Sequence, residues 1–540
     1  MTKISNSVST PILRLPNELV GSICDLLPDS AIKNLRLTCG FLSDKAQLRG
    51  LSRVFISPSL RNLSVLRGIA DHDTFRQCVE EIIWDDATLE PIESHDGRYR
   101  YRWVPDVEDS YEEDGQEETS EWEDVDSDEE EEMSERLDVD SDEVDGQEWF
   151  IQRCRFSINH LKDRMRRDAK RPDILATQEE LNNAMSFGES FNHYKILEQQ
   201  QQEILDSGAD EDAFRYALQR LPRLKRVTVT PAAHGLLFQP LYKTPMIRDF
   251  PYGFLYPIPK GWLVSEDGWN RKIPSPWDGD ASEEEKNQWR GFRIVTRILA
   301  EVHHHHVSEL VLDNHKLLTG VSHFAFHPPT EEYHNLCIVL KRPGFRRVDL
   351  SIVTGYTTDM WAKDWDTYRN GDLYKALAGA PDLEHVALQT EYHEGRAPQG
   401  GVNEFVSLFD VFPLDHWTKL KHFGLSAMQV AQSDLVSFLA KLPSTLQSVE
   451  LSFLGFLRDQ GNYAGLLSDI RDKLGWRHRP VDVRVKIRVL IKNNLSPIGQ
   501  YIRLDEEVQN YVYGSGPLPF SPKGYHDYVS GVEEDEFDSH

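Results

Sequence analysis

The pattern of apolar and polar residues along this chain contains a recurring unit. Each unit begins with apolar residues at helical spacing and ends with a few residues in which apolar and polar positions alternate. Residues 217–229, 376–388 and 439–451 carry the unit, each with a proline between the two runs, and the third copy has one extra residue. Helical period predicts an amphipathic helix, and alternation predicts a half-buried strand. Because proline readily ends a helix, we expect each unit to form a helix, a turn and a strand.

Other segments fit the strand half of this unit once its register is fixed. The central apolar residues of the predicted strands are Ile82, Val227, Leu310, Val348, Val386, Phe423 and Val449, with Val483 and Val485 closing the series. The spacings between the middle members are 38, 38, 37 and 26 residues. Units of this length bury a continuous core when they stack in series. We therefore predict an α/β protein with a parallel sheet; a doubly wound α/β domain is the structural alternative.

Residues next to the central positions should point away from the core, because side chains alternate along a strand. A surface of arginine and histidine with occasional acids suits an acidic or phosphorylated segment of a partner. The alternative is that these side chains are merely solvated and that docking uses the segment 231–277, which we expect to be ordered but irregular. The tentative substrate-binding residues on the strand face are Arg226, Thr228, Arg347, Asp349, His385 and His422.

Residues 12–57 show a different pattern, which predicts three short helices. Pro16 suits a first helical turn, Glu18 complements the positive end of a helix dipole, and Pro28 stops the first helix. A single core is marginal below roughly 70–80 residues, so this unit cannot bury all of its large side chains alone. The surplus apolar surface must contact a partner or the rest of the chain.

This N-terminal segment resembles an F-box. The Leu-Pro-x-Glu-Leu start at Leu15, the Pro-Asp break at Pro28 and the block around Phe41 follow the order of that family. The resemblance implies binding to the Skp-family adaptor of an SCF ubiquitin ligase, which connects it to a cullin and a ubiquitin-conjugating enzyme. The implied adaptor contacts are Leu15, Pro16, Leu19, Ile23, Leu27, Leu35, Leu37 and Phe41.

The repeat array that follows resembles F-box proteins with leucine-rich-repeat-like C-terminal regions, and residues 61–87 and 289–302 resemble filamentous-fungal members in particular. The resemblance covers most of residues 12–500. The resemblance implies a three-helix F-box at 12–57 followed by an irregular leucine-rich-repeat-like solenoid. Its first helix–strand unit would cover 58–105, and its substrate-binding domain would cover 149–513. We expect a disordered C-terminal tail at 514–540.

The net charge of −29 is concentrated in one segment. Residues 106–148 hold 24 acidic residues against the single basic Arg136, which leaves about −6 for the rest of the chain. Like-charge repulsion and scarce apolar residues predict a disordered acidic insert here. The functional alternative is an arm that contacts basic partners.

Composition excludes several classes of protein. No stretch of 18 or more consecutive apolar residues occurs, so no membrane helix is predicted. The N-terminus lacks the charged-then-apolar order of residues that is typical of a signal peptide. The five dispersed cysteines form no C-x-x-C pair, which favours reduced thiols in the cytoplasm or nucleus.

Candidate chemical motifs do not assemble into a site. The consecutive His303–His306 side chains cannot all converge on one metal ion, and the adjacent Asp85 and Asp86 point to opposite faces of a strand. No phosphate loop, nucleophile elbow or zinc-protease helix motif occurs. We therefore predict no catalytic residue, metal site or cofactor. The basic cluster at 164–171 favours a solvated helix face, with an intramolecular partner for the acidic segment as the alternative, and nucleic acid is not expected as a partner.

Together these expectations describe a substrate-recognition subunit of an SCF-type E3 ubiquitin ligase without enzymatic activity of its own. It would bind the Skp-family adaptor, and through it cullin, with the F-box, and an unknown protein substrate with the repeat domain. One alternative is a scaffold or chromatin-associated interaction protein that uses the acidic insert, and another is an enzyme on an α/β fold. Co-purification of the adaptor and cullin would distinguish the ligase subunit from the scaffold protein and from the enzyme.

Overall fold

The chain forms a mixed α/β structure with a mostly parallel sheet. The expected acidic insert falls almost entirely outside the residues that the structure describes, except that α6 begins at Asp145, inside its expected range. The computed structural model describes residues 15–25, 27, 32, 35, 38–45, 51–92, 145–167, 172–259, 261–262, 277, 283–317, 319–328, 330–353, 365–391, 405–492, 500–520 and 531–535.

Strands of the ten-stranded main sheet follow one another in chain order, and every pairing is parallel. A doubly wound sheet would reverse its strand order at a switch point, and this order does not reverse. A short strand, β5 (Val321–Ser322), pairs with β6 off the main path. The strands in order are β1 (Arg53–Ile56), β2 (Glu81–Asp85), β3 (Arg226–Thr230), β4 (Glu309–Leu312), β6 (Arg347–Val353), β7 (His385–Gln389), β8 (His422–Ser426), β10 (Ser448–Ser452) and β12 (Lys486–Arg488).

Strand pairing confirms the predicted register from Ile82 to Val449, since each predicted central residue lies opposite the next one. The prediction was wrong at the C-terminal end. Val483 lies in a 3-10 turn and is exposed, and Ile487 pairs with Val449 instead. The turn after Pro480 delays the strand, so that Val485 is buried just before β12 begins.

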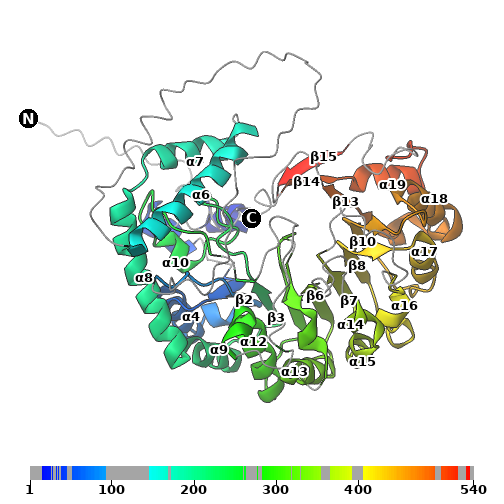
Figure 1. Ribbon diagram of the computed structural model, residues 1–540, viewed down its shortest axis with the longest axis horizontal. Coiled ribbons are helices and arrows are strands. Elements are labelled where there is room, and N and C mark those ends of the chain that lie inside the picture. The colour runs from blue at the N-terminus through cyan, green and yellow to red at the C-terminus, as the bar shows by residue number, and fades with distance from the viewer. Residues whose placement is uncertain are drawn as a thin grey trace, which may run out of the picture.

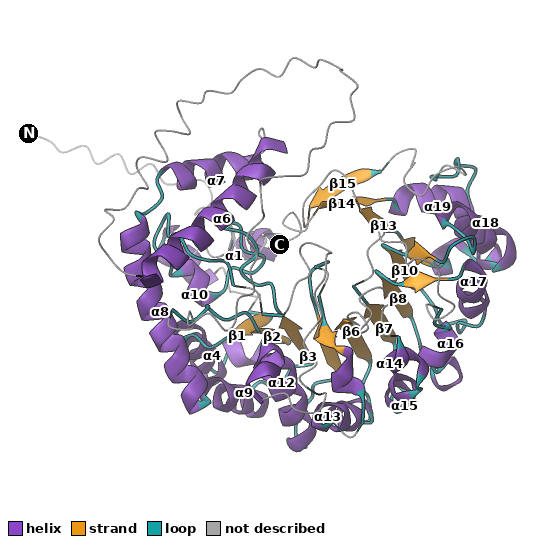
Figure 2. Ribbon diagram, in the orientation of Figure 1, coloured by secondary structure: helices purple, strands orange, loops and turns teal. Residues whose placement is uncertain are grey.

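Helices cover the outer side of the curved sheet, and the strands line its inner side (Figures 1 and 2). In the three proline-containing units the helix ends, a turn follows, and Leu224, Leu383 or Leu446 is buried just before the strand, as predicted. The helices of this layer are α4 (Leu60–Asp71), α9 (Ala209–Arg220), α12 (Arg290–Glu301), α13 (Glu331–Leu340), α14 (Asp366–Arg369), α15 (Asp372–Ala378), α16 (Leu408–Val411), α17 (Gln432–Ala440) and α18 (Tyr463–Lys473), with the short α11 (Glu283–Lys286) before α12.

The N-terminal helical unit has a small core of its own. Helices α1 (Asn17–Asp25) and α3 (Gly40–Lys45) are described in full, and Ile32, Leu35 and Thr38 between them are helical. The segment 12–57 expected for this unit also contains β1, which pairs with β2 as the first strand of the sheet. Its short Arg-Val-Phe-Ile sequence alternates in burial, which explains why it joins the sheet rather than the helices.

A second, smaller core lies beside the start of the sheet. It joins α6 (Asp145–Arg167), α7 (Pro172–Asn182) and α8 (Phe187–Ser207) to the irregular segment that follows β3 and contains α10 (Pro245–Arg248). Phe254, Leu255 and Tyr256 of that segment are buried here, so the expectation of an ordered but irregular connection is confirmed over its described residues.

Antiparallel strands end the array at its C-terminus. β13 (Leu490–Lys492), β14 (Gln500–Arg503) and β15 (Val532–Asp535) form a three-stranded sheet beside α19 (Asp505–Tyr513), and two further short strands, β9 (Gln429–Val430) and β11 (Gly455–Phe456), pair with each other. The disordered tail expected from 514 onwards is therefore wrong for the described part. Phe520 is buried against Tyr463, with ring centroids 4.9 Å apart, and Arg503 pairs with Glu534 of β15 at 3.0 Å.

Candidate functional site

One row of side chains runs across the inner face of the sheet, immediately before the central residue of each strand. Parallel register places these residues side by side, one per strand. We call this set the strand-face row: Arg53, Glu81, Arg226, Glu309, Arg347, His385, His422, Ser448 and Lys486.

Charges in the first half of the strand-face row neutralise one another. Arg53 pairs with Glu81 at 2.8 Å, and Arg226 pairs with Glu309 at 2.6 Å. The Thr228 hydroxyl donates a hydrogen bond to Glu81 at 2.6 Å and is buried. Arg226 and Thr228 were expected to face a substrate, but neighbouring strands already bind their polar groups.

Arg347 and Asp349 form a second self-contained group with His385. Arg347 donates to the Asp349 carboxylate at 2.5 Å, and His385 Nε2 lies 3.1 Å from its other oxygen. Burial alone would raise the pKa of Asp349, but the bonds and charges of His385 and Arg347 outweigh it and lower the pKa to about 2. The carboxylate is therefore ionised and neutralises the arginine beside it.

His422 extends this group to the next strands. Its ring stacks on His385 with centroids 4.0 Å apart and an interplanar angle of 12°, and its Nδ1 lies 2.8 Å from Ser448 Oγ. Burial, followed by the charge of His385, lowers the pKa of His422 to about 3. The Asp349 carboxylate contacts His385, whereas Ser448 contacts His422. A nucleophilic triad needs both contacts on one imidazole, so these four residues do not form one.

Large apolar side chains on the N-terminal helical unit face outward. Leu19, Ile23 and Phe41 are 51%, 37% and 38% exposed. The small core beneath them consists of Val20, Cys24, Ile32 and Leu42.

The other expected adaptor contacts differ from one another in exposure. Pro16 is exposed, whereas Leu15, Leu27 and Leu35 are partly buried against the small core of their own unit. Leu37 lies outside the described residues. Among the described positions, the outward face is therefore formed by Pro16, Leu19, Ile23 and Phe41.

Two carboxylates at the end of β2 are fully enclosed. Asp85 lies 3.6 Å from His234 Nε2, and Asp86 accepts hydrogen bonds from Trp262 Nε1 at 2.8 Å and from the Gly291 amide at 2.6 Å. Burial raises the pKa of Asp85 to about 8 and that of Asp86 to about 6. They contact different groups and end the strand, as predicted, and neither is open to a substrate from solvent.

The histidine run at 303–306 does not converge. His305 is buried at the end of α12, where Nε2 donates to the Leu299 carbonyl at 3.1 Å and Nδ1 accepts from the Val307 amide at 3.1 Å. Burial lowers the pKa of His305 to about 4, so this ring is neutral. In the described part of the chain, no three His, Cys, Asp or Glu side chains could hold a metal ion.

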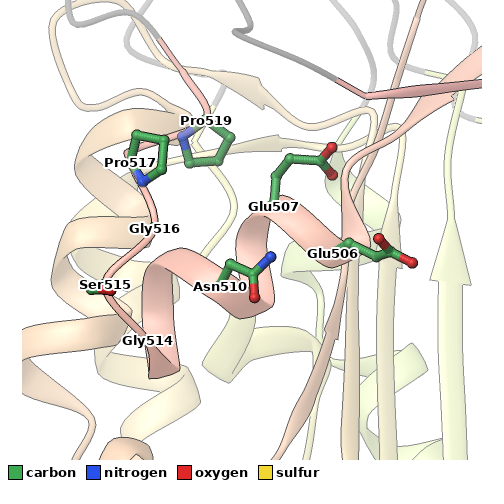
Figure 3. Close-up of a pocket in the computed structure, with 8 residues that line it drawn as sticks. All are labelled: Glu506, Glu507, Asn510, Gly514, Ser515, Gly516, Pro517 and Pro519. Atoms are coloured by element: carbon green, nitrogen blue, oxygen red, sulfur yellow. The ribbon is translucent and has the colours of Figure 1, made fainter.

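A surface hollow of about 600 Å³ lies beside α19. Residues of that helix and of the glycine, serine and proline segment that follows it line this hollow (Figure 3). The Asn510 carbonyl accepts hydrogen bonds from the Gly514 and Gly516 amides, both at 3.1 Å. Much of the wall is thus a helix end that satisfies its own backbone groups, and it presents no catalytic pair.

No protein-family model matches this chain, and a comparison with curated proteins finds no similar sequence. Among the described helices, none is long and apolar enough to cross a membrane.

Proposed function

We propose that this protein is the substrate-recognition subunit of an SCF-type E3 ubiquitin ligase. An F-box at the N-terminus would bind the Skp-family adaptor, and a leucine-rich-repeat-like solenoid would bind a protein substrate. The observation that carries the proposal is the outward face of the N-terminal unit, where Leu19, Ile23 and Phe41 remain exposed although a separate small core lies directly beneath them. Exposed large apolar side chains gathered on one small unit are typical of a protein-binding surface.

The rest of the chain supports the substrate-binding half of this proposal. Strands in chain order, parallel pairing and helices on the outer side of the sheet support the proposed solenoid, because helix–strand units stacked in series produce this arrangement. Such an array offers an extended inner face for a partner. Polar groups in its first half and centre, at Arg226, Thr228 and Arg347, pair with neighbouring side chains, which favours a binding surface over a catalytic site.

Substitution of the outward face tests the adaptor contact. Leu19→Asp with Phe41→Asp should abolish co-purification of the Skp-family adaptor and cullin, because a few apolar anchors carry most of the energy of an interface. Both side chains lie outside the small core, so the unit should stay folded. Leu15→Asp is a poorer test, because Leu15 packs on that core.

A matched control uses exposed apolar residues elsewhere. Leu175 on α7 and Ile196 on α8 are as exposed as Leu19, so Leu175→Asp with Ile196→Asp should leave adaptor recovery unchanged. Undiminished recovery with the Leu19 and Phe41 variant would contradict the proposed function.

A further inference from the structure

Positive charge without a matching acid gathers where the last parallel strand begins. Residues 471–492 hold eight Lys or Arg residues and two Asp residues, in a chain whose net charge is −29. One of these acids, Asp472, accepts two bonds from Arg471, at 2.8 and 3.1 Å. The other, Asp482, is exposed. Lys473 pairs with Asp469, just outside this segment, at 2.7 Å. Arg477, Lys486 and Arg488 are exposed, so the described part of the segment still presents net positive charge to solvent.

The basic side chains here differ from those in the first half of the strand-face row. Arg477 and Lys486 are exposed, and among the described residues neither has an acid within ion-pair distance. Arg488 approaches Glu450 only at 3.8 Å. Lys486 and Arg488 flank the buried Ile487, so both point away from the core on the same face of β12. Positive charge at the β12 end of the sheet is therefore not fully neutralised, whereas Arg53 and Arg226 near the other end pair with acids on neighbouring strands.

Exposed apolar side chains lie between these charges in the sequence. Val481 and Val483, in the turn that leads into β12, are 76% and 51% exposed. A rigid frame holds the turn: Arg479 donates to the Leu446 carbonyl at 2.9 Å, and Tyr513 donates to the Val485 carbonyl at 2.7 Å. A surface that is already ordered loses little conformational entropy when a partner binds.

We propose that this surface docks an acidic segment of a partner protein chain that also carries apolar side chains. We call it the β12 patch: Arg477, Val481, Val483, Lys486 and Arg488. Opposite charge selects acidic segments, and the two valines favour those with an aliphatic side chain between the acids. The patch has no aromatic side chain on which a base could stack, which favours a peptide over single-stranded nucleic acid. The inference does not depend on adaptor binding, so its test and that of the proposed function fail separately.

Fluorescence anisotropy with the full-length protein tests the patch. The probe is a fluorescein-labelled synthetic peptide in which Asp and Glu alternate with Val and Leu. Arg477→Glu with Lys486→Glu should weaken its binding about tenfold, which corresponds to about 1.4 kcal/mol. Lys375→Glu with Arg458→Glu makes the same change in net charge at exposed positions elsewhere and should leave binding unchanged.

The valines provide a second and independent measurement. Val481→Ser with Val483→Ser should weaken binding of the alternating peptide but not that of poly-aspartate, and neither exposed side chain is needed for folding. Equal weakening by the two charge variants would overturn the proposal, because binding would then follow net charge alone. Tighter binding of a single-stranded oligonucleotide than of the peptide would overturn the choice of partner. Peptide binding that appears only after residues 106–144 are replaced by a Gly/Ser linker would make this chain's own acidic segment the occupant.

Discussion

The Asp210 carboxylate, at the start of α9, is buried; one of its oxygens accepts a hydrogen bond from the Glu211 amide at 2.9 Å, and its cation is Arg290. Both of its oxygens accept hydrogen bonds from Arg290 at the start of α12. Further along α12, Arg297 pairs with Glu211 at 2.6 Å. These contacts hold neighbouring helices of the outer layer together. Since a buried charge is costly without its partner, the first pair should matter far more than the partly exposed second one.

At the residue scale we predict that Arg290→Ala lowers the free energy of unfolding by about 3–5 kcal/mol, because it leaves the Asp210 carboxylate buried without its cation. Urea denaturation followed by circular dichroism measures the change. Arg290→Met with Asp210→Asn should recover much of the loss, since no charge then stays buried. A loss as small as that of Arg458→Ala, whose side chain is almost fully exposed, would show that solvent reaches the carboxylate.

At the scale of helices and strands, α12 is positioned by the close approach of its Gly291 to the end of β2. A Cβ added to Gly291 would lie 2.4 Å from the Trp84 ring and 2.6 Å from an Asp86 oxygen. The Gly291 amide also donates to that carboxylate at 2.6 Å. Helix and sheet meet here with no space for a methyl group.

Gly291→Ala should therefore destabilise the protein by about 1–3 kcal/mol, although alanine is the better helix former. Gly68→Ala, in the exposed face of α4 where nothing lies within 4 Å of the added Cβ, should instead stabilise by about 0.5–1 kcal/mol. Melting temperatures of the two variants measure the contrast. Stabilisation by both substitutions would mean that Trp84 moves freely enough to admit the methyl group, and destabilisation by both would contradict the prediction for Gly68.

Elements with a strong local signal could be predicted from the sequence, and others could not. The proline and the alternating residues of 376–388 predict a helix end and a strand, because both depend on neighbouring residues alone. The strand β1 is four residues long and directly follows the helical segment, so its pairing with β2 had no comparable signal. Phe520 looked like part of a polar tail because its burial depends on Tyr463, far away in the sequence.

In the candidate site, too, some features could be predicted from the sequence and others could not. Register predicts that Arg226 and Arg347 point away from the core, and both lie in the strand-face row. The same register places Glu309 between them, so the pairing of Arg226 with Glu309 could have been anticipated. The stacking of His385 on His422 and the bond to Ser448 depend on side-chain rotamers, which the pattern of residues does not fix.

At the scale of the whole molecule, the main core runs continuously from Val54 of β1 to Phe520 after α19. Because the strands of the main sheet follow one another in chain order, each strand pairs only with its neighbours, and a local loss of stability should spread only a short distance. Phe520→Ala removes a ring that packs on Tyr463 of α18.

We predict that Phe520→Ala speeds amide hydrogen exchange in α18, β12 and α19 but leaves β1 to β4 protected as in the unsubstituted protein. Removal of a buried phenylalanine costs about 3–5 kcal/mol locally. Hydrogen-exchange mass spectrometry resolves these segments. Uniform acceleration over the whole chain would instead show that the array unfolds as a single cooperative unit.

Side chains of the strand-face row are regularly spaced, because one side chain comes from each strand. Neighbouring strands are about 4.8 Å apart at the backbone, whereas an extended peptide advances about 3.3 Å per residue. A peptide lying across the strands comes back into step after three residues, about 10 Å against two strand spacings of about 9.6 Å, but its side chain then points to the opposite side. It is in step again after six residues, about 20 Å, which nearly equals four strand spacings of about 19 Å. Six is an even number, so the matching side chains again point to the same side of the peptide. Sequences that dock along this face should therefore repeat their anchoring residues with a period of six.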